Sequence, residues 1–189
     1  MTISERVRAA VLERVEDNWH QQLAFLHDLV AHRSVLGSER GIQERIAAEL
    51  RTLGLQPELY TFEPAQLEGH RGFSPPEWEY EDRPNLRARL PGRGGGRSLT
   101  FNAHVDVVPA TPEHHWNHDP WSATVVGERM YGRGAADMKS GISAMIYALR
   151  SIREAGVELA GDLLVDTVIE EECTGNGALA SLLLGPRTD

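Results

Sequence analysis

Three short segments of this sequence carry a histidine or acidic residues close to where predicted strands end, and together they could form a hydrolytic metal site. They are residues 101–109, 131–139 and 170–172. Imidazole and carboxylate groups are ligands that suit zinc and its divalent neighbours. The chain has a single cysteine, Cys173, which excludes a structural zinc site built from several thiolates.

His104 and Asp106 lie two residues apart in a predicted strand. Alternate residues of an extended chain project to the same side, so the two side chains can lie together at the end of the strand. The carboxylate would then orient the imidazole and strengthen it as a metal ligand. For an isolated His-x-Asp, an acid that only stabilises the histidine is the better explanation. The pair therefore indicates a metal site only together with the other segments.

Asp137 follows Gly132 and Gly134, which allow a tight turn, and it begins a predicted helix. A carboxylate held at a helix N-terminus can bridge two cations. Two other interpretations remain open at this point. Asp137 could simply cap the helix, or the glycines could belong to a dinucleotide loop, although an acid in place of the third glycine would repel a pyrophosphate.

Glu170, Glu171 and Glu172 follow a strongly apolar predicted strand. Three successive acids repel one another unless cations or solvent compensate their charge. One of them could bind a metal ion while its neighbour acts as a base. A solvated run of charges is the alternative, but Gly175 and Gly177 indicate a constrained backbone rather than a loose polar loop.

Strands and helices alternate along the chain, which predicts a layered α/β fold that would position these segments. Apolar spacing predicts helices over about residues 5–31, with Ser4 as N-cap, and over residues 39–53, 138–155 and 175–184. Strands are predicted over residues 57–62, 85–90, 99–108, 123–126 and 162–170. Residues 63–84 are predicted to be a surface excursion, and the glycine-rich residues 91–97 a turn between two strands.

The composition is that of an ordinary globular protein, since 189 residues with 41% hydrophobic and 25% charged content allow one well-buried domain. A formal net charge of -9 argues against a general nucleic-acid binder. No stretch approaches the roughly 20 apolar residues of a membrane helix, and the first 17 residues carry charges where a signal peptide needs an apolar run. We therefore expect a cytoplasmic protein that binds neither nucleic acid nor a membrane.

The three segments, in this order, resemble the dinuclear zinc metallopeptidase family of acetylornithine deacetylase, succinyl-diaminopimelate desuccinylase, aminoacylase and glutamate-releasing carboxypeptidase. The resemblance covers about residues 20–185 and is carried by residues 101–109, the Trp at 116, residues 119–121, 131–139 and 170–172. It implies a zinc-exopeptidase-like catalytic domain with three layers, α/β/α, around a mostly parallel mixed sheet.

The resemblance also implies a ligand set. His104 would bind one metal ion, Asp137 would bridge two, and Glu172 would bind the second. The implied cofactors are two divalent ions, with zinc as the first expectation and cobalt or manganese as alternatives. On this basis each ion has only two protein ligands in this chain, one of them shared, whereas catalytic zinc normally has three.

Two catalytic roles follow from the same resemblance. Asp106 would orient His104, and Glu171 would be the general base that takes a proton from a metal-bridging water and passes it to the leaving amine. Glu170 stands where the family usually has Asp and is not expected to be a ligand. The implied reaction is hydrolysis of the amide bond of a small N-acyl amino acid or peptide.

Family members also have a further acidic ligand, a late histidine and a small domain for dimerisation and substrate binding, all of which would lie beyond Asp189. Residues 1–189 are therefore expected to be the N-terminal part of a truncated catalytic metal-binding domain without the small lid domain. A homodimer is an option for the full-length form, and we expect the sheet to end on an exposed edge at the 162–170 strand. The alternative is a non-catalytic α/β domain that keeps the motifs and binds a metal or a partner.

Two further groups contain residue types that can bind metal ions. The histidines at 114, 115 and 118 cluster near Trp116, and a solvated loop at the rim of the cleft is favoured over a supplementary metal site. For Cys173, beside Glu172, packing in the interior is favoured over metal binding or oxidation.

Overall fold

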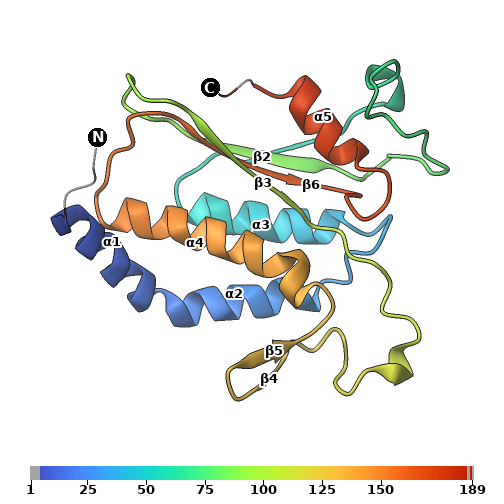
Figure 1. Ribbon diagram of the computed structural model, residues 1–189, viewed down its shortest axis with the longest axis horizontal. Helices are drawn as coiled ribbons and strands as arrows, with labels where there is room; N and C mark the ends of the chain where they lie inside the picture. The colour runs from blue at the N-terminus through green and yellow to red at the C-terminus, as the bar shows by residue number, and fades with distance from the viewer. Residues whose placement is uncertain (1–4, 187, 189) are drawn as a thin grey trace.

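The computed structural model describes residues 5–186 and 188, and it shows a four-stranded sheet with helices on both faces (Figure 1). The helices are α1 (Glu5–Asp17), α2 (Trp19–Ala31), α3 (Arg40–Thr52), α4 (Ser140–Glu154) and α5 (Asn176–Leu184). Helices α2, α3 and α4 lie on one face and α5 on the other. The layered α/β fold is thus confirmed. Among the described residues no helix is long and apolar enough to cross a membrane.

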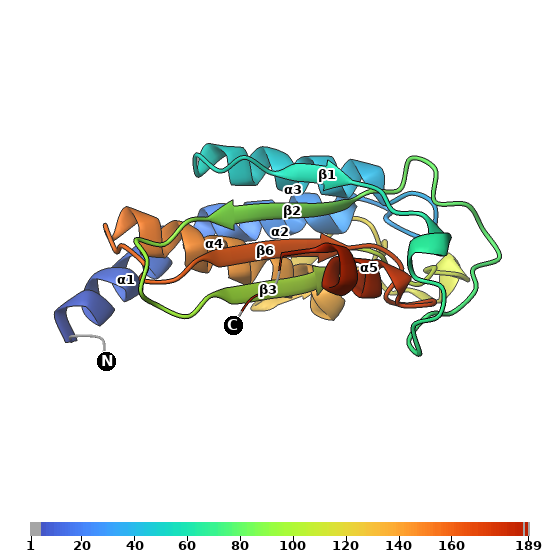
Figure 2. The same cartoon turned by 90° about the horizontal axis from the view of Figure 1, so that it is seen from above.

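The strands of the main sheet are β1 (Glu58–Tyr60), β2 (Asn85–Leu90), β3 (Leu99–His104) and β6 (Leu163–Val168), in the order β1-β2-β6-β3. Strand β2 is antiparallel to both of its neighbours, and β3 is parallel to β6. Three strands therefore run in one direction and only β2 in the other, so the mostly parallel mixed sheet is confirmed. Figure 2 shows the order of the strands from above.

The core lies between this sheet and the three helices. Their apolar faces meet there, and the fully buried members include Leu29, Ile42, Ile46, Leu50, Leu86, Ile142, Ile146 and Leu149. Each such side chain contributes on the order of 1.5–3 kcal/mol through removal of its surface from water. The period of the apolar residues, which predicted α3 and α4, is the pattern that builds this interface.

The predicted single helix over residues 5–31 is wrong in one respect, because the chain turns at Asn18 between α1 and α2. The Asn18 side chain is buried and donates to Glu154 Oε2 of α4 at 2.6 Å. A tertiary hydrogen bond thus accompanies the break, which helical periodicity does not indicate. The proposed cap Ser4 lies outside the described residues.

Residues 91–97 connect β2 to β3 without a helix or strand of their own, but these two strands are not neighbours in the sheet, because β6 lies between them. The segment instead pairs with residues before β6: Arg93 and Gly96 donate their N–H groups to the oxygens of Leu159 and Ala160. A Cβ on Gly161 would lie 1.9 Å from the Arg97 oxygen, so only glycine allows this approach. Strand β6 is thus an interior strand and not the edge that was expected, and the edge strands of the sheet are β1 and β3.

Two other segments differ from expectation. Residues 63–84 are not wholly on the surface, because Leu67, Tyr80 and Arg83 are buried. The short strand predicted at residues 123–126 forms as β4 (Thr124–Val126), but it pairs with an unpredicted strand, β5 (Arg129–Tyr131), in a separate hairpin.

Candidate metal centre

Three segments that are far apart in the sequence meet at one end of the sheet. His104 is the last residue of β3 and lies opposite Val168, the last residue of the parallel strand β6. The ends of parallel neighbours lie at the same edge of a sheet, so the loop after β6 brings Glu172 towards His104. Asp137 arrives from the segment that precedes α4. One ligand atom from each of His104, Asp137 and Glu172 lies within 4.8 Å of the other two.

The imidazole of His104 is buried, and its two nitrogens have different surroundings. Nδ1 lies 3.0 Å from the main-chain oxygen of Asp106, and Nε2 lies 3.0 Å from Asp137 Oδ1. Both oxygens only accept, so each ring nitrogen can donate a hydrogen in the metal-free protein. Nε2 is the nitrogen that faces an acidic side chain, and a metal ion there would replace its hydrogen while Nδ1 keeps its main-chain partner. Burial lowers the pKa of His104, but hydrogen bonds and charge from Asp106 and Asp137 outweigh burial and raise the pKa to about 9.

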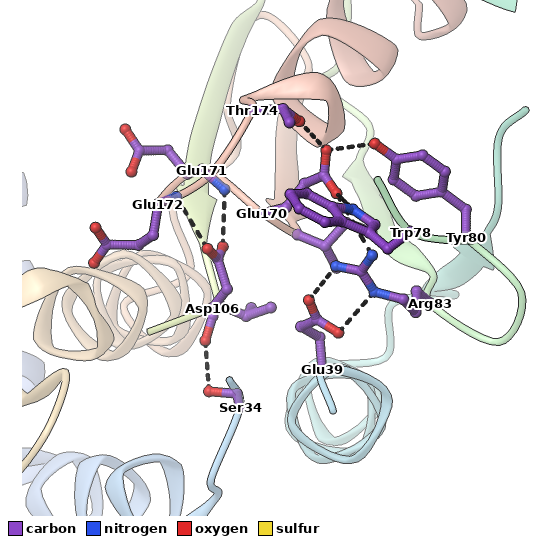
Figure 3. A network of polar contacts seen from close by, with 12 residues as sticks. Ser34, Glu39, Trp78, Tyr80, Arg83, Asp106, Glu170, Glu171, Glu172 and Thr174 are labelled. Atoms are coloured by element: carbon purple, nitrogen blue, oxygen red, sulfur yellow. Dashed lines mark hydrogen bonds and ion pairs between the residues drawn. The ribbon is translucent and has the colours of Figure 1, made fainter. Parts of the chain in front are cut away.

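The carboxylate of Asp106 connects two of the three segments. Its Oδ1 accepts the N–H of Glu171 and its Oδ2 accepts the N–H of Glu172, each at 3.0 Å (Figure 3). Asp106 Oδ1 lies 3.6 Å from His104 Nδ1, whereas the main-chain oxygen of Asp106 lies 3.0 Å from the same nitrogen. The contact that orients His104 is therefore made mainly by the backbone of Asp106, while the side chain holds the loop after β6.

Asp137 does not act as a helix cap. Its backbone is non-helical, with φ -118° and ψ 103°, and α4 begins only at Ser140 without a side-chain cap. Gly134 has a φ of +76°, and a Cβ there would lie 2.5 Å from Val107 Cγ1, so this turn requires glycine. The Asp137 side chain is 78% exposed and contacts His104, which leaves its carboxylate open to a ligand.

The three consecutive glutamates have separate environments. Glu170 is fully buried, whereas the Glu171 side chain is 54% exposed and lies 3.8 Å from His104 Nε2. Burial and the nearby charges of Asp137, Asp106 and Glu171 raise the pKa of Glu172, against the opposing effect of His104. Such crowded carboxylates favour a bound cation, which would relieve their mutual repulsion.

Lys139 is the only lysine of the sequence, and its role was not predicted. It is fully buried next to Gly134, and its Nζ donates to the main-chain oxygen of His32 at 2.7 Å. Burial lowers its pKa from 10.5 to about 7. The motif that contains Lys139 was recognised from the sequence, but its burial follows from the tertiary packing.

We expect the ionisation of Lys139 to make the stability of the metal-free protein depend on pH. Between about pH 7 and pH 10 the unfolded chain holds a proton that folded Lys139 has released, so the free energy of unfolding rises with pH in this range. Conversely, the contribution of Lys139 to stability is lost as the pH falls from about 10 to the folded pKa of about 7. Lys139→Met should lack this component, so its melting temperature relative to the wild type should fall from pH 6 to pH 10 in the presence of EDTA. NMR of the single labelled lysine gives the pKa directly, and a value near 10.5 would contradict the expectation.

The histidines of the 109–122 loop do not form a second centre. His114 and His115 contact each other edge to face, and His118 packs on Tyr131. Within the described part of the chain, the group of His104, Asp137 and Glu172 is the only one whose metal-binding atoms converge. Cys173 is exposed, so the prediction that it packs in the interior is wrong.

Comparison with known proteins agrees with this geometry. Residues 100–186 match the model of peptidase family M20/M25/M40. This stretch belongs to that family. The M20 segment contains His104, Asp106, Asp137, Glu171 and Glu172, and the resemblance drawn from the motifs is confirmed.

Individual relatives of the M20 segment extend the similarity over more of the chain. The N-formyl-4-amino-5-aminomethyl-2-methylpyrimidine deformylase of Bacillus subtilis is 31% identical over 183 residues, which are 94% of this chain and 39% of that protein. A succinyl-diaminopimelate desuccinylase of Psychromonas ingrahamii is 36% identical over 151 residues, 79% of this chain and 34% of that protein. The chain thus spans 34–39% of the length of these relatives.

A solved structure shows the same fold. The di-peptidase Dug1p of Saccharomyces cerevisiae superimposes with a TM-score of 0.69 at 19% identity, over 93% of this chain and 37% of that one. The arrangement of helices and strands around the candidate centre is therefore the fold that this di-peptidase also has.

Proposed function

We propose that this chain supplies part of the active site of a metal-dependent hydrolase that cleaves the amide bond of small N-acyl amino acids or peptides. The observation that carries the proposal is the convergence of His104, Asp137 and Glu172, each from a different segment, within 4.8 Å. One imidazole and two carboxylates form a donor set suited to zinc, with cobalt or manganese as alternatives.

The donor set fits a metal ion for two reasons. Nδ1 of His104 has a main-chain oxygen as its partner, and Nε2 lies beside the carboxylate of Asp137, where an ion could bind both. The Asp137 carboxylate is exposed and could bridge a pair of ions, with His104 on one and Glu172 on the other. Such ions, when bound, polarise an amide carbonyl and lower the pKa of a bridging water.

Glu171 has the position of a general base in this scheme. Its Oε2 lies 3.8 Å from His104 Nε2, yet it is not one of the three converging ligands. Asp106 fixes its main chain, so its carboxylate can accept a proton at the centre and return it to the leaving amine.

The names of the relatives support the substrate class. A deformylase and a desuccinylase both remove an acyl group from nitrogen, and a di-peptidase cleaves an amide between two amino acids. The bond shared by these substrates is an amide of a small molecule. The chain spans 34–39% of the two enzymes matched by sequence, so the proposal concerns the whole protein to which this chain contributes.

A second candidate function is metal binding without catalysis. It is favoured by the ligand count, because three donors converge among the described residues and a pair of ions would need more than these three. In that case the chain would bind a single divalent ion, and Glu171 would have no catalytic role.

Metal titration of the 189-residue chain tests whether the candidate centre binds metal ions and how complete it is. We expect calorimetry to show weak binding of divalent ions, since each ion of a pair would have two protein ligands, one of them shared. Hydrolysis of N-formyl, N-acetyl and N-succinyl amino acids should be negligible for this chain alone. Tight binding of two zinc ions would contradict the expected incompleteness of the centre, and no binding at all would overturn the proposed function.

A further inference from the structure

A buried ionic network lies directly behind the glutamates of the candidate centre. It consists of Glu39, Arg83 and Glu170, whose side chains are almost completely buried. Arg83 binds Glu39 through two hydrogen bonds of 3.0 and 2.5 Å, and its Nη1 lies 3.5 Å from Glu170 Oε2. The network thereby ties the beginning of α3 and the end of the 63–84 segment to the loop after β6 (Figure 3).

The Glu170 carboxylate also receives three neutral donors. Trp78 Nε1 donates at 2.8 Å, Tyr80 Oη donates at 2.5 Å, and the hydroxyl of Thr174 donates from within the loop itself. With Arg83, this gives one buried carboxylate four polar partners. Such a set holds the side chain in one place and compensates its charge without a metal ion.

These side-chain contacts hold the backbone of Glu170 in an unusual conformation. Its φ of +54° lies in the left-handed region, which a residue with a side chain rarely adopts. A conformation of this kind persists only where the surroundings determine it. Because of this turn, Glu170 points into the protein while Glu171 and Glu172 point to the opposite side of the chain, as Figure 3 shows.

The loop is therefore fixed at two points. The network holds the side chain of Glu170, and the Asp106 carboxylate holds the N–H groups of Glu171 and Glu172. We propose that Glu39, Arg83 and Glu170 are positioning residues, which set the direction of Glu171 and Glu172 at the candidate centre without touching it. The inference rests on the proposed function for its meaning, but the geometry it claims can be tested without catalysis.

A contribution to stability alone is the competing explanation, since breaking any buried ion pair destabilises a fold. The chain offers a matched control for it. Asp166, on β6, forms a buried pair with Arg87 at 2.9 and 3.0 Å and accepts from Ser181. None of these three residues contacts the candidate centre. Asp166→Asn should therefore destabilise the protein as Glu170→Gln does, without changing the direction of the glutamates.

The experiment measures amide hydrogen exchange by NMR in Glu170→Gln, Arg83→Met and Asp166→Asn, with α4 amides as the monitor of global unfolding. The first two variants should accelerate exchange at the amides of Glu171 and Glu172 by about tenfold or more beyond any global change, because a loop released from the network would open more often and part these amides from the Asp106 carboxylate. Asp166→Asn should leave them as protected as in the wild type. Equal effects of all three variants at these two amides would overturn the inference.

Zinc affinity gives the second readout. If Glu171 and Glu172 lose their direction in the network variants, Zn²⁺ binding should weaken by about tenfold, the lower end of the effect of losing a residue that supports metal ligands. Asp166→Asn should leave Zn²⁺ affinity unchanged. Affinity unchanged in all variants would count against the inference. If the wild type itself binds no zinc, the proposed function fails while the exchange data still decide on the network. Should the first variants not fold, Glu170→Asp and Trp78→Phe weaken the same contacts more gently.

Discussion

Replacing Glu171 by glutamine is expected to lower the turnover of the active protein by about 10²-fold or more, as the loss of a general base does. Glutamine has nearly the same shape but cannot accept a proton at neutral pH. The side chain is 54% exposed and does not belong to the converging ligands, so metal content and stability should change little. Steady-state kinetics together with metal analysis of the purified variant measure both.

Two comparisons make this expectation specific. Glu172→Gln removes a proposed ligand and should lower metal content together with turnover. Glu128→Gln changes an exposed acid on the β4–β5 turn and should leave both unchanged. If Glu171→Gln turned over at a near-normal rate, Glu171 would be removed from the mechanism.

Local patterns predicted most of the elements of this fold. Helix α3 was expected at residues 39–53 and forms at Arg40–Thr52, because its apolar face and the glycine after it are both local signals. Strand order was not predictable in this way. That β6 lies between β2 and β3 depends on pairing between residues far apart in the sequence, such as Leu99 with Leu163 and Leu86 with Thr167, which no turn or period encodes.

For the candidate centre too, local patterns predicted one part and tertiary packing supplied the other. The residue types and spacing of the motifs singled out His104, Asp137 and Glu172, and the structure brings these three together. Asp106 was also predicted as a supporting residue, but the network behind Glu170 was not predictable, because its other members come from elsewhere in the chain. Arg83 belongs to a segment interpreted as a surface excursion, yet it lies buried against Glu170.

Asp106→Asn is expected to weaken metal binding by about 10- to 100-fold, the usual effect of losing a group that supports metal ligands. Both carboxylate oxygens accept backbone N–H groups, from Glu171 and Glu172. Asparagine keeps one oxygen and turns an NH₂ group towards the other N–H, so one buried donor loses its partner. The free energy of unfolding should fall by about 1–3 kcal/mol for that reason.

The effect should appear at the glutamates more than at the histidine, because His104 Nδ1 is held mainly by the main-chain oxygen of Asp106, which the substitution retains. Asp119→Asn is a matched control: Asp119 also accepts a backbone N–H, that of Trp121, at 2.8 Å, but on an exposed loop. That variant should keep wild-type zinc affinity in calorimetry and nearly wild-type stability in urea unfolding. Unchanged zinc affinity in Asp106→Asn would mean that the loop after β6 keeps its ligand geometry without the Asp106 carboxylate, and the buried contacts of Glu170 would then be its principal support.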